Sequence, residues 1–101
     1  MTPTMTTVVD LPSLESLVAY VRQTLCEHDQ LDPGQTPLSR AMLRRQGRVC
    51  GMIFELEGPR LLRTYAIWAG DEQRLLFYDS TGKRFAEVRL SDGPDPALIP
   101  S

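Results

Sequence analysis

The side chains best suited to a binding chemistry are arginines gathered in one stretch of the sequence. Residues 39 to 63 hold six arginines against two glutamates, whereas the formal net charge of the whole chain is -2. Arginine makes bidentate hydrogen bonds to phosphate and carboxylate groups. Such a stretch is also typical of a solvated face, or of an ion-pair partner for Glu55 and Glu57. The arginines are Arg40, Arg44, Arg45, Arg48, Arg60 and Arg63.

Aromatic side chains later in the chain could add base stacking to this basic stretch, as in proteins that bind single-stranded nucleic acid. No aromatic residue lies among residues 39 to 48, and the chain as a whole is acidic. A nucleic-acid footprint normally shows in the charge of the domain, so nucleic acid is a possible partner but not the favoured one. The candidate binding residues are Arg40, Arg44, Arg45, Arg48, Trp68, Phe77 and Phe85.

A second group of reactive side chains is the run Cys26, Glu27, His28 and Asp29, which together with Cys50 supplies metal-ligand atoms. Positions two apart on a helix do not face each other, and a zinc site needs three or four ligands that converge. We interpret Cys26 as a half-buried thiol. His28 is expected at the solvated end of a helix, where it meets the negative end of the helix dipole. The sequence therefore predicts no metal site and no cofactor.

Residues 80 to 83 read Ser-Thr-Gly-Lys, which looks like the end of a phosphate-binding loop. The first glycine of such a loop would fall at Phe77, and Arg84 stands where Ser or Thr should follow the lysine. A tight hairpin turn explains the run better. The only histidine, His28, cannot be combined with a serine and a carboxylate into a catalytic triad. We also find no paired carboxylates that could act as a general acid and base. The sequence therefore predicts no catalytic residues and a protein that is not an enzyme.

One helix is strongly indicated near the start of the chain. Leu14, Leu17, Val18, Val21 and Leu25 recur at three- and four-residue steps, which places them on one stripe of a helix. A polar side chain at position 10 or 13 can accept from the free amides at its start. The helix is expected to end near position 28.

Four later segments alternate or are rich in β-forming residues, as strands require. They are residues 48 to 57, 61 to 69, 74 to 79 and 83 to 90. Residues 38 to 47 leave two alternatives open. Thr36 and Pro37 are typical of a helix start, whereas Gln46 and Gly47 are equally suited to the turn of a hairpin.

The predicted fold is α+β, with one N-terminal amphipathic helix packed on a four- or five-stranded antiparallel meander. A single domain covers residues 8 to 91, and residues 1 to 7 and 92 to 101 are expected to be flexible termini. The order of a helix followed by a meander resembles, at the level of the fold alone, cystatin-like and other domains in which a sheet wraps around a helix. A strand at residues 6 to 9 would strengthen the resemblance. The cystatin inhibitory motif is absent, so the resemblance implies no activity.

The last hairpin allows a register to be predicted. With a three-residue loop that ends at Gly82 in the left-handed region, Asp79 lies opposite Lys83 and Phe77 lies opposite Phe85. This register gives the hairpin two different faces. One of them carries Leu76, Tyr78, Ala86, Val88 and Leu90.

One helix, about 10 Å wide, can cover only one face of a four-stranded sheet that is about 19 Å across. Soluble monomers rarely leave a large apolar face bare. The sequence therefore predicts a non-enzymatic interaction module that self-associates as a homodimer or homo-oligomer, or binds a protein partner, through the face opposite the helix. The alternative is nucleic-acid or phosphate-ligand binding through the arginines at positions 40 to 48. The residues expected on that face are Ile53, Phe77, Phe85 and one of two sets, Leu61/Tyr65/Ile67 or Leu62/Ala66/Trp68.

The composition also bears on where the protein works. No stretch reaches the roughly 18 consecutive apolar residues of a membrane span. The two cysteines, Cys26 and Cys50, are too few for a disulfide framework. Residues 1 to 9 have neither the basic nor the apolar region of a signal peptide. We expect a cytoplasmic protein with no membrane partner.

Overall fold

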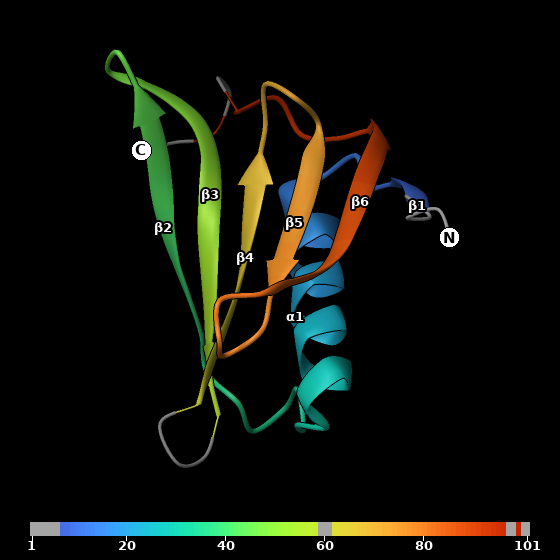
Figure 1. The fold of residues 1–101 in the computed structure, drawn as a ribbon. Coiled ribbons are helices and arrows are strands. Elements are labelled where there is room, and N and C mark those ends of the chain that lie inside the picture. Colours follow the sequence, from blue (N-terminus) through green and yellow to red (C-terminus); the bar gives the residue numbers. More distant parts are fainter. Residues whose placement is uncertain (1–6, 59–61, 97–98, 100–101) are drawn as a thin grey trace, which may run out of the picture.

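The computed structural model describes residues 7–58, 62–96 and 99. In this part of the chain one helix, α1, packs against one face of a six-stranded sheet (Figure 1). The prediction of an α+β fold is therefore confirmed. Within the same residues no helix is long and apolar enough to cross a membrane.

Helix α1 spans Leu14–Asp29 and is capped at both ends. At its start, the Ser13 hydroxyl accepts the backbone N–H of Ser16 at 3.0 Å, and the Ser16 hydroxyl accepts that of Ser13 at 3.2 Å. These bonds satisfy two amides that have no partner within the helix. At its end, Gln30 takes the left-handed conformation with φ of 55°, which stops the helix. The predicted stripe and the polar cap at position 13 are confirmed.

The sheet has more strands than the sequence predicts, and the helix is not the first element. The six strands are β1 (Thr7–Asp10), β2 (Leu38–Arg45), β3 (Arg48–Glu57), β4 (Arg63–Ala69), β5 (Arg74–Tyr78) and β6 (Arg84–Asp92). They lie in the order β1-β6-β5-β4-β3-β2, and all neighbours are antiparallel except β1 and β6. The predicted antiparallel sheet of four or five strands is thus corrected to a mixed sheet of six. Strands β2 to β6 form a meander. The last of them, β6, pairs in parallel with β1, the strand that precedes α1.

The segment that the sequence leaves open, residues 38 to 47, forms strand β2 and its turn. Gln46 and Gly47 both have positive φ, 56° and 80°. Two successive positive φ angles are the signature of a two-residue type I′ turn, whose twist matches that of the flanking strands. The hairpin alternative is therefore correct, and the short helix is not formed.

The hairpin between β5 and β6 agrees with its predicted turn but not with its predicted register. Gly82 has φ of 86°, and the Asp79 N–H donates to the Lys83 carbonyl at 2.9 Å, as expected. Beyond the loop a β-bulge inserts one extra residue, so that Phe77 pairs with Ala86 instead of Phe85. A shift of one residue moves a strand's side chains to the opposite face, so the predicted faces of this hairpin are wrong.

The core lies between α1 and the sheet. Phe77 and Trp68 have no exposed surface there, and the Phe77 ring lies 6.4 Å from the ring of Tyr20 on α1. Phe85, the bulge residue, stacks on His28 of α1. The prediction that Phe77 and Phe85 point away from the helix is therefore wrong. Phe77 shares the buried face of β5 with Leu75, and the bulge turns Phe85 toward α1 as well. The strand residues buried here are Met52, Phe54, Leu56, Thr64, Ala66, Trp68, Leu75, Phe77, Val88 and Leu90.

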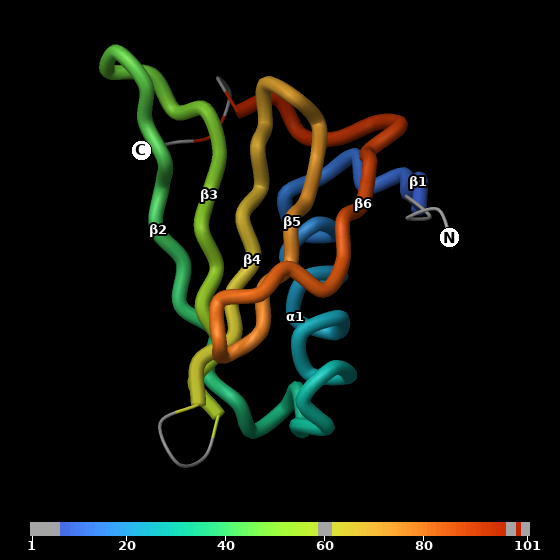
Figure 2. Tube along the Cα trace, viewed as in Figure 1, coloured from blue at the N-terminus to red at the C-terminus, as the bar shows by residue number. Residues whose placement is uncertain are grey.

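The chain after β6 crosses the ends of β5 and β4 toward β2 and β3 (Figure 2). Pro94 is buried, Pro96 lies against Gly70, and Ile99 packs against the core. Flexible termini were predicted at residues 1 to 7 and 92 to 101. Of these, residues 1–6, 97–98 and 100–101 lie outside the described residues, while Thr7 belongs to β1 and residue 92 to β6.

Candidate functional site on the open face of the sheet

The face of the sheet turned away from α1, which we call the open face, carries a continuous line of aliphatic side chains. Ala41, Ile53, Ile67 and Leu76 are direct cross-strand neighbours on β2, β3, β4 and β5. Phe54, the next residue after Ile53, is completely buried on the side of α1. Because successive side chains of a strand point to opposite faces, the four aliphatic residues point away from the helix. We call these four residues the apolar row.

A pair of tyrosines lies beside the apolar row. Tyr65 and Tyr78 are cross-strand neighbours on β4 and β5, and both are partly exposed. Their rings stack with centroids 4.8 Å apart and planes 11° apart. Of the two sets predicted for this face, the one that contains Tyr65 and Ile67 is therefore found there. Leu61 of that set lies outside the described residues, as does Arg60.

Two charged clusters flank these side chains. In the first, which joins β3 to β4, an Arg63 nitrogen lies 3.7 Å from a carboxylate oxygen of Glu55 and another lies 3.7 Å from one of Glu57. All three side chains are more than a third exposed, so the pairs fix geometry and add little stability. We call these three residues the Arg63 cluster, which has one acid in excess.

The second cluster joins β5 to β6. Arg74 lies 3.0 Å from Glu72 and 3.4 Å from Glu87, and Arg84 lies 3.5 Å from the same Glu87. The hydrogen bond to Glu72 raises the pKa of Arg74, which keeps its charge. Arg89 is the cross-strand neighbour of Arg74 and is exposed. We call these five residues the Arg74 cluster, which has one base in excess.

The structure separates the arginines that the sequence groups together. Arg40 pairs with Phe54 in the sheet and therefore lies on the face that α1 covers in part. The other three lie at the tip of the hairpin between β2 and β3, where Arg45 lies 3.7 Å from Asp71. Those three are Arg44, Arg45 and Arg48. The candidate residues thus form one group of three and one isolated member.

The aromatic candidates do not join those arginines. Trp68 and Phe77 are fully buried, and Phe85 lies with its ring centroid 3.6 Å from that of His28 and its plane tilted by 10°. A partner could reach the first two only if α1 moved away from the sheet. The exposed aromatic surface comes instead from Tyr65, which belongs to one of the sets expected on this face, and from Tyr78, which was expected on the face opposite Phe77.

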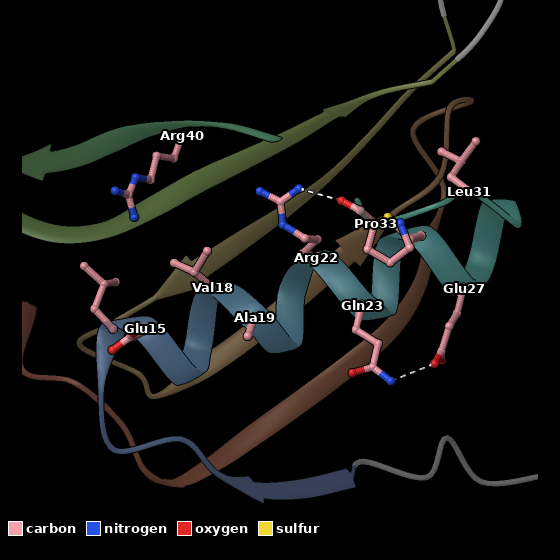
Figure 3. A pocket seen from close by; sticks show the side chains of 11 residues that line it. Glu15, Val18, Ala19, Arg22, Gln23, Glu27, Leu31, Pro33 and Arg40 are labelled. Carbon is pink, nitrogen blue, oxygen red and sulfur yellow. Dashed lines mark hydrogen bonds between the residues drawn. The ribbon is translucent and has the colours of Figure 1, made fainter. Parts of the chain in front are cut away.

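On the other face of the sheet, α1 does not extend behind β2 (Figure 1). A groove of about 840 Å³ runs along the helix on that side (Figure 3). Arg22 lies in its wall. The Arg22 Nη1 donates to the carbonyls of Pro33 at 3.1 Å and Thr36 at 3.0 Å, which ties the loop after α1 to the helix. Arg40 faces this groove from β2. Arg22 and Arg40 are 18 positions apart, so no local pattern in the sequence connects them.

The remaining candidates for chemistry in the described residues are metal ligands and the two cysteine thiols. Within residues 7–58, 62–96 and 99, no three ligand-type side chains gather into a potential metal site. Cys26 is buried in α1, and burial raises the pKa of its thiol despite the opposing charge of Arg22. Since the thiolate is the reactive form, Cys26 is a poor nucleophile. The Cys50 thiol donates to the Leu43 carbonyl at 3.4 Å.

No protein-family model, no curated protein and no solved structure matches this chain. The candidate functional site is therefore defined by its own geometry. It consists of the apolar row, the tyrosine pair and the two charged clusters, all on the open face.

Proposed function

We propose that this protein is a non-enzymatic interaction module that pairs with a second copy of itself through the open face. The observation that carries the proposal is the apolar row, four aliphatic side chains in direct register on a face that α1 does not cover. Tyr65 and Tyr78 widen the row, and charged clusters flank it. An apolar centre with aromatic residues and a polar rim is typical of protein interfaces.

The distribution of charge favours a second copy as the partner. In a pair of sheets related by a two-fold axis that lies between them, the open face meets a copy of itself. An axis perpendicular to the line that joins the two clusters places the Arg63 cluster of one copy over the Arg74 cluster of the other. One cluster has an acid in excess and the other a base, so the two attract each other and fix the orientation.

The size of the open face is consistent with a stable dimer. Strands β2 to β6, with about eight residues each, span about 24 Å by about 26 Å, or roughly 620 Å² in projection. A standard interface buries about 800 Å² of accessible surface per partner. Because side chains make an accessible surface larger than its projection, the open face is of the order that a dimer needs.

The alternative is a nucleic-acid or phosphate-ligand binder that uses the arginines at positions 40 to 48. Three of these arginines share the hairpin tip, and in the described part of the chain only Arg45 of the three forms an ion pair. The stacking surface expected for such a protein is weak, because Trp68 and Phe77 are buried. We therefore place this function second.

The proposal is tested by the substitution Ile67→Glu, which puts a charge in the middle of the apolar row. The matched control is Leu62→Glu, because Leu62 is 46% exposed and lies outside the row. Sedimentation equilibrium of the full chain should give a dimer for the native protein and for the control. The same measurement should give a monomer for Ile67→Glu.

A further inference from the structure

The groove beside α1 is not used by the proposed dimer, because it lies on the other face of the sheet. Its volume of about 840 Å³ falls within the range of small-molecule sites, roughly 300–1,000 Å³. Most of its surface is apolar, and this surface is the part of α1 and the following loop that faces β2. The apolar lining residues are Leu14, Val18, Ala19, Cys26, Leu31 and Pro33.

Two arginines reach this groove from opposite walls. Arg22 extends from the middle of α1 and Arg40 from β2, and both side chains are directed toward the space between helix and strand (Figure 3). Within the described residues neither forms an ion pair, although the chain has 13 acidic residues against 11 basic ones. Two unpaired cations beside apolar surface favour an anion between them.

The acidic residues of the groove do not neutralise these arginines. Glu27 accepts a hydrogen bond from the Gln23 side chain at 3.0 Å, and both project from the side of α1 opposite Arg22 (Figure 3). Glu15 lies in the first turn of α1, where its charge meets the positive end of the helix dipole. The space between Arg22 and Arg40 is thus left without a negative group of the described chain.

A smaller cavity of about 370 Å³ continues the groove. It shares Leu14 and Arg40 with the groove and is lined further by Met42 and Met52. The side chain of Ile99 lines this cavity and packs against the core. An aliphatic group is therefore already accommodated next to Arg40.

We infer that the groove binds an amphiphile with one carboxylate and one unbranched aliphatic chain. The carboxylate lies between Arg22 and Arg40, and the chain covers Leu14 and Val18 toward Met42. Guanidinium groups match a carboxylate in geometry as well as in charge. A wholly apolar ligand would remove water from both arginines without replacing its hydrogen bonds, and a small polar anion would leave the apolar wall uncovered.

Isothermal titration calorimetry of the full chain with dodecanoate tests this inference, and dodecyltrimethylammonium serves as a probe of equal chain length and opposite charge. We expect saturable binding of one dodecanoate per chain. The cation should bind at least about tenfold more weakly, because it makes no charge-assisted hydrogen bond to arginine.

The variant Arg40→Gln separates the head-group contact from the fold. Arg40 is exposed and makes no side-chain hydrogen bond within the described residues, whereas Arg22 holds the loop after α1 and is left intact. Arg40→Gln should weaken dodecanoate binding by about tenfold and should not weaken binding of the cation, because the substitution removes a charge of the same sign. The control Arg48→Gln, also exposed but at the hairpin tip, should bind dodecanoate like the native protein.

Three results would overturn the inference. They are the absence of saturable dodecanoate binding, equal binding of the two probes, and equal dodecanoate binding by Arg40→Gln and the native protein. If Arg40→Gln instead lost self-association and kept its affinity for dodecanoate, the groove would be an interface between copies of this chain. The readout is independent of the Ile67→Glu experiment, because that substitution lies on the opposite face.

Discussion

Tyr65 and Tyr78 stack face to face on neighbouring strands, with ring centroids 4.8 Å apart, on the side of the sheet opposite α1. A stacked aromatic pair is worth about 0.5–1.5 kcal/mol beyond the area it buries, so the two rings hold each other in place. Side chains that are already fixed lose little conformational entropy when a partner covers them. The open face thus presents a preorganised surface, and this is the physical reason it suits association.

The assignment of the two faces is tested by two leucines that are adjacent in sequence. Leu75 is fully buried under α1, whereas Leu76 belongs to the apolar row and is partly exposed. Leu75→Ala should lower the free energy of unfolding by about 2–5 kcal/mol. Leu76→Ala should lower it by about 1 kcal/mol. Urea denaturation at low protein concentration, where association contributes least, measures both values. Equal losses, or a larger loss for Leu76→Ala, would show that the faces are assigned incorrectly.

The turn between β5 and β6 leads to a prediction about pH. The Thr81 hydroxyl donates to the Asp79 carboxylate at 2.6 Å, and the N–H groups of Thr81 and Lys83 donate to the same oxygen at 2.9 and 3.0 Å. These bonds, the hydroxyl first, lower the pKa of Asp79. Since the folded pKa lies below the unfolded one, the stabilisation is complete above the ordinary pKa of about 3.9 and is lost as the pH falls through the folded pKa.

The substitution Asp79→Ala should therefore destabilise the protein at neutral pH and have a smaller effect in acid. Urea denaturation at neutral pH and at a pH below the folded pKa gives the difference from the native protein at each pH. Ser80→Ala, in the same loop, is the control, because the Ser80 side chain makes no hydrogen bond within the described residues, and it should show no such pH dependence. A difference for Asp79→Ala that is the same at both pH values would refute the role given to its carboxylate.

The alternative function is tested at the tip of the hairpin between β2 and β3. A protein that bound nucleic acid there would be retained on heparin and bind labelled RNA, with an affinity that falls as salt rises. We expect neither at physiological salt. Salt-dependent RNA binding by the native protein, lost in the double variant Arg44→Glu, Arg45→Glu, would favour the alternative over the open face.

Elements with a strong local signal could be predicted from the sequence. The stripe from Leu14 to Leu25 depends only on helical spacing, and Ser13 caps the helix through bonds within three residues. The turn at Gly82 likewise follows from a conformation that glycine adopts readily. These features are fixed by neighbours in the chain, so the sequence contains the information needed to place them.

Features that depend on distant residues could not be placed in this way. Strand β1 has four residues, and its pairing with β6 joins Val9 to Leu90 across almost the whole chain. The bulge at Phe85 could not be predicted because alternation in β6 is compatible with either register. The register that forms pairs Phe77 with Ala86 and lets Phe85 stack on His28, a residue far away in the sequence. The position of α1 then decided which aromatic residues were buried and which were left on the open face.

The central claim, self-association through the open face, is tested most directly by sedimentation equilibrium at micromolar concentration. The proteins compared are the native chain, Ile67→Glu and Leu62→Glu. The substituted residue in Ile67→Glu lies between Ile53 and Leu76 in the apolar row, so a dimer would bury a charge without a partner. Far-ultraviolet circular dichroism confirms that each variant is folded.

We predict twice the chain mass for the native protein and for Leu62→Glu, and the single chain mass for folded Ile67→Glu. A native protein that sediments as a single chain throughout the micromolar range would contradict the account. So would a folded Ile67→Glu variant that remains a dimer, because the interface would then lie elsewhere on the molecule.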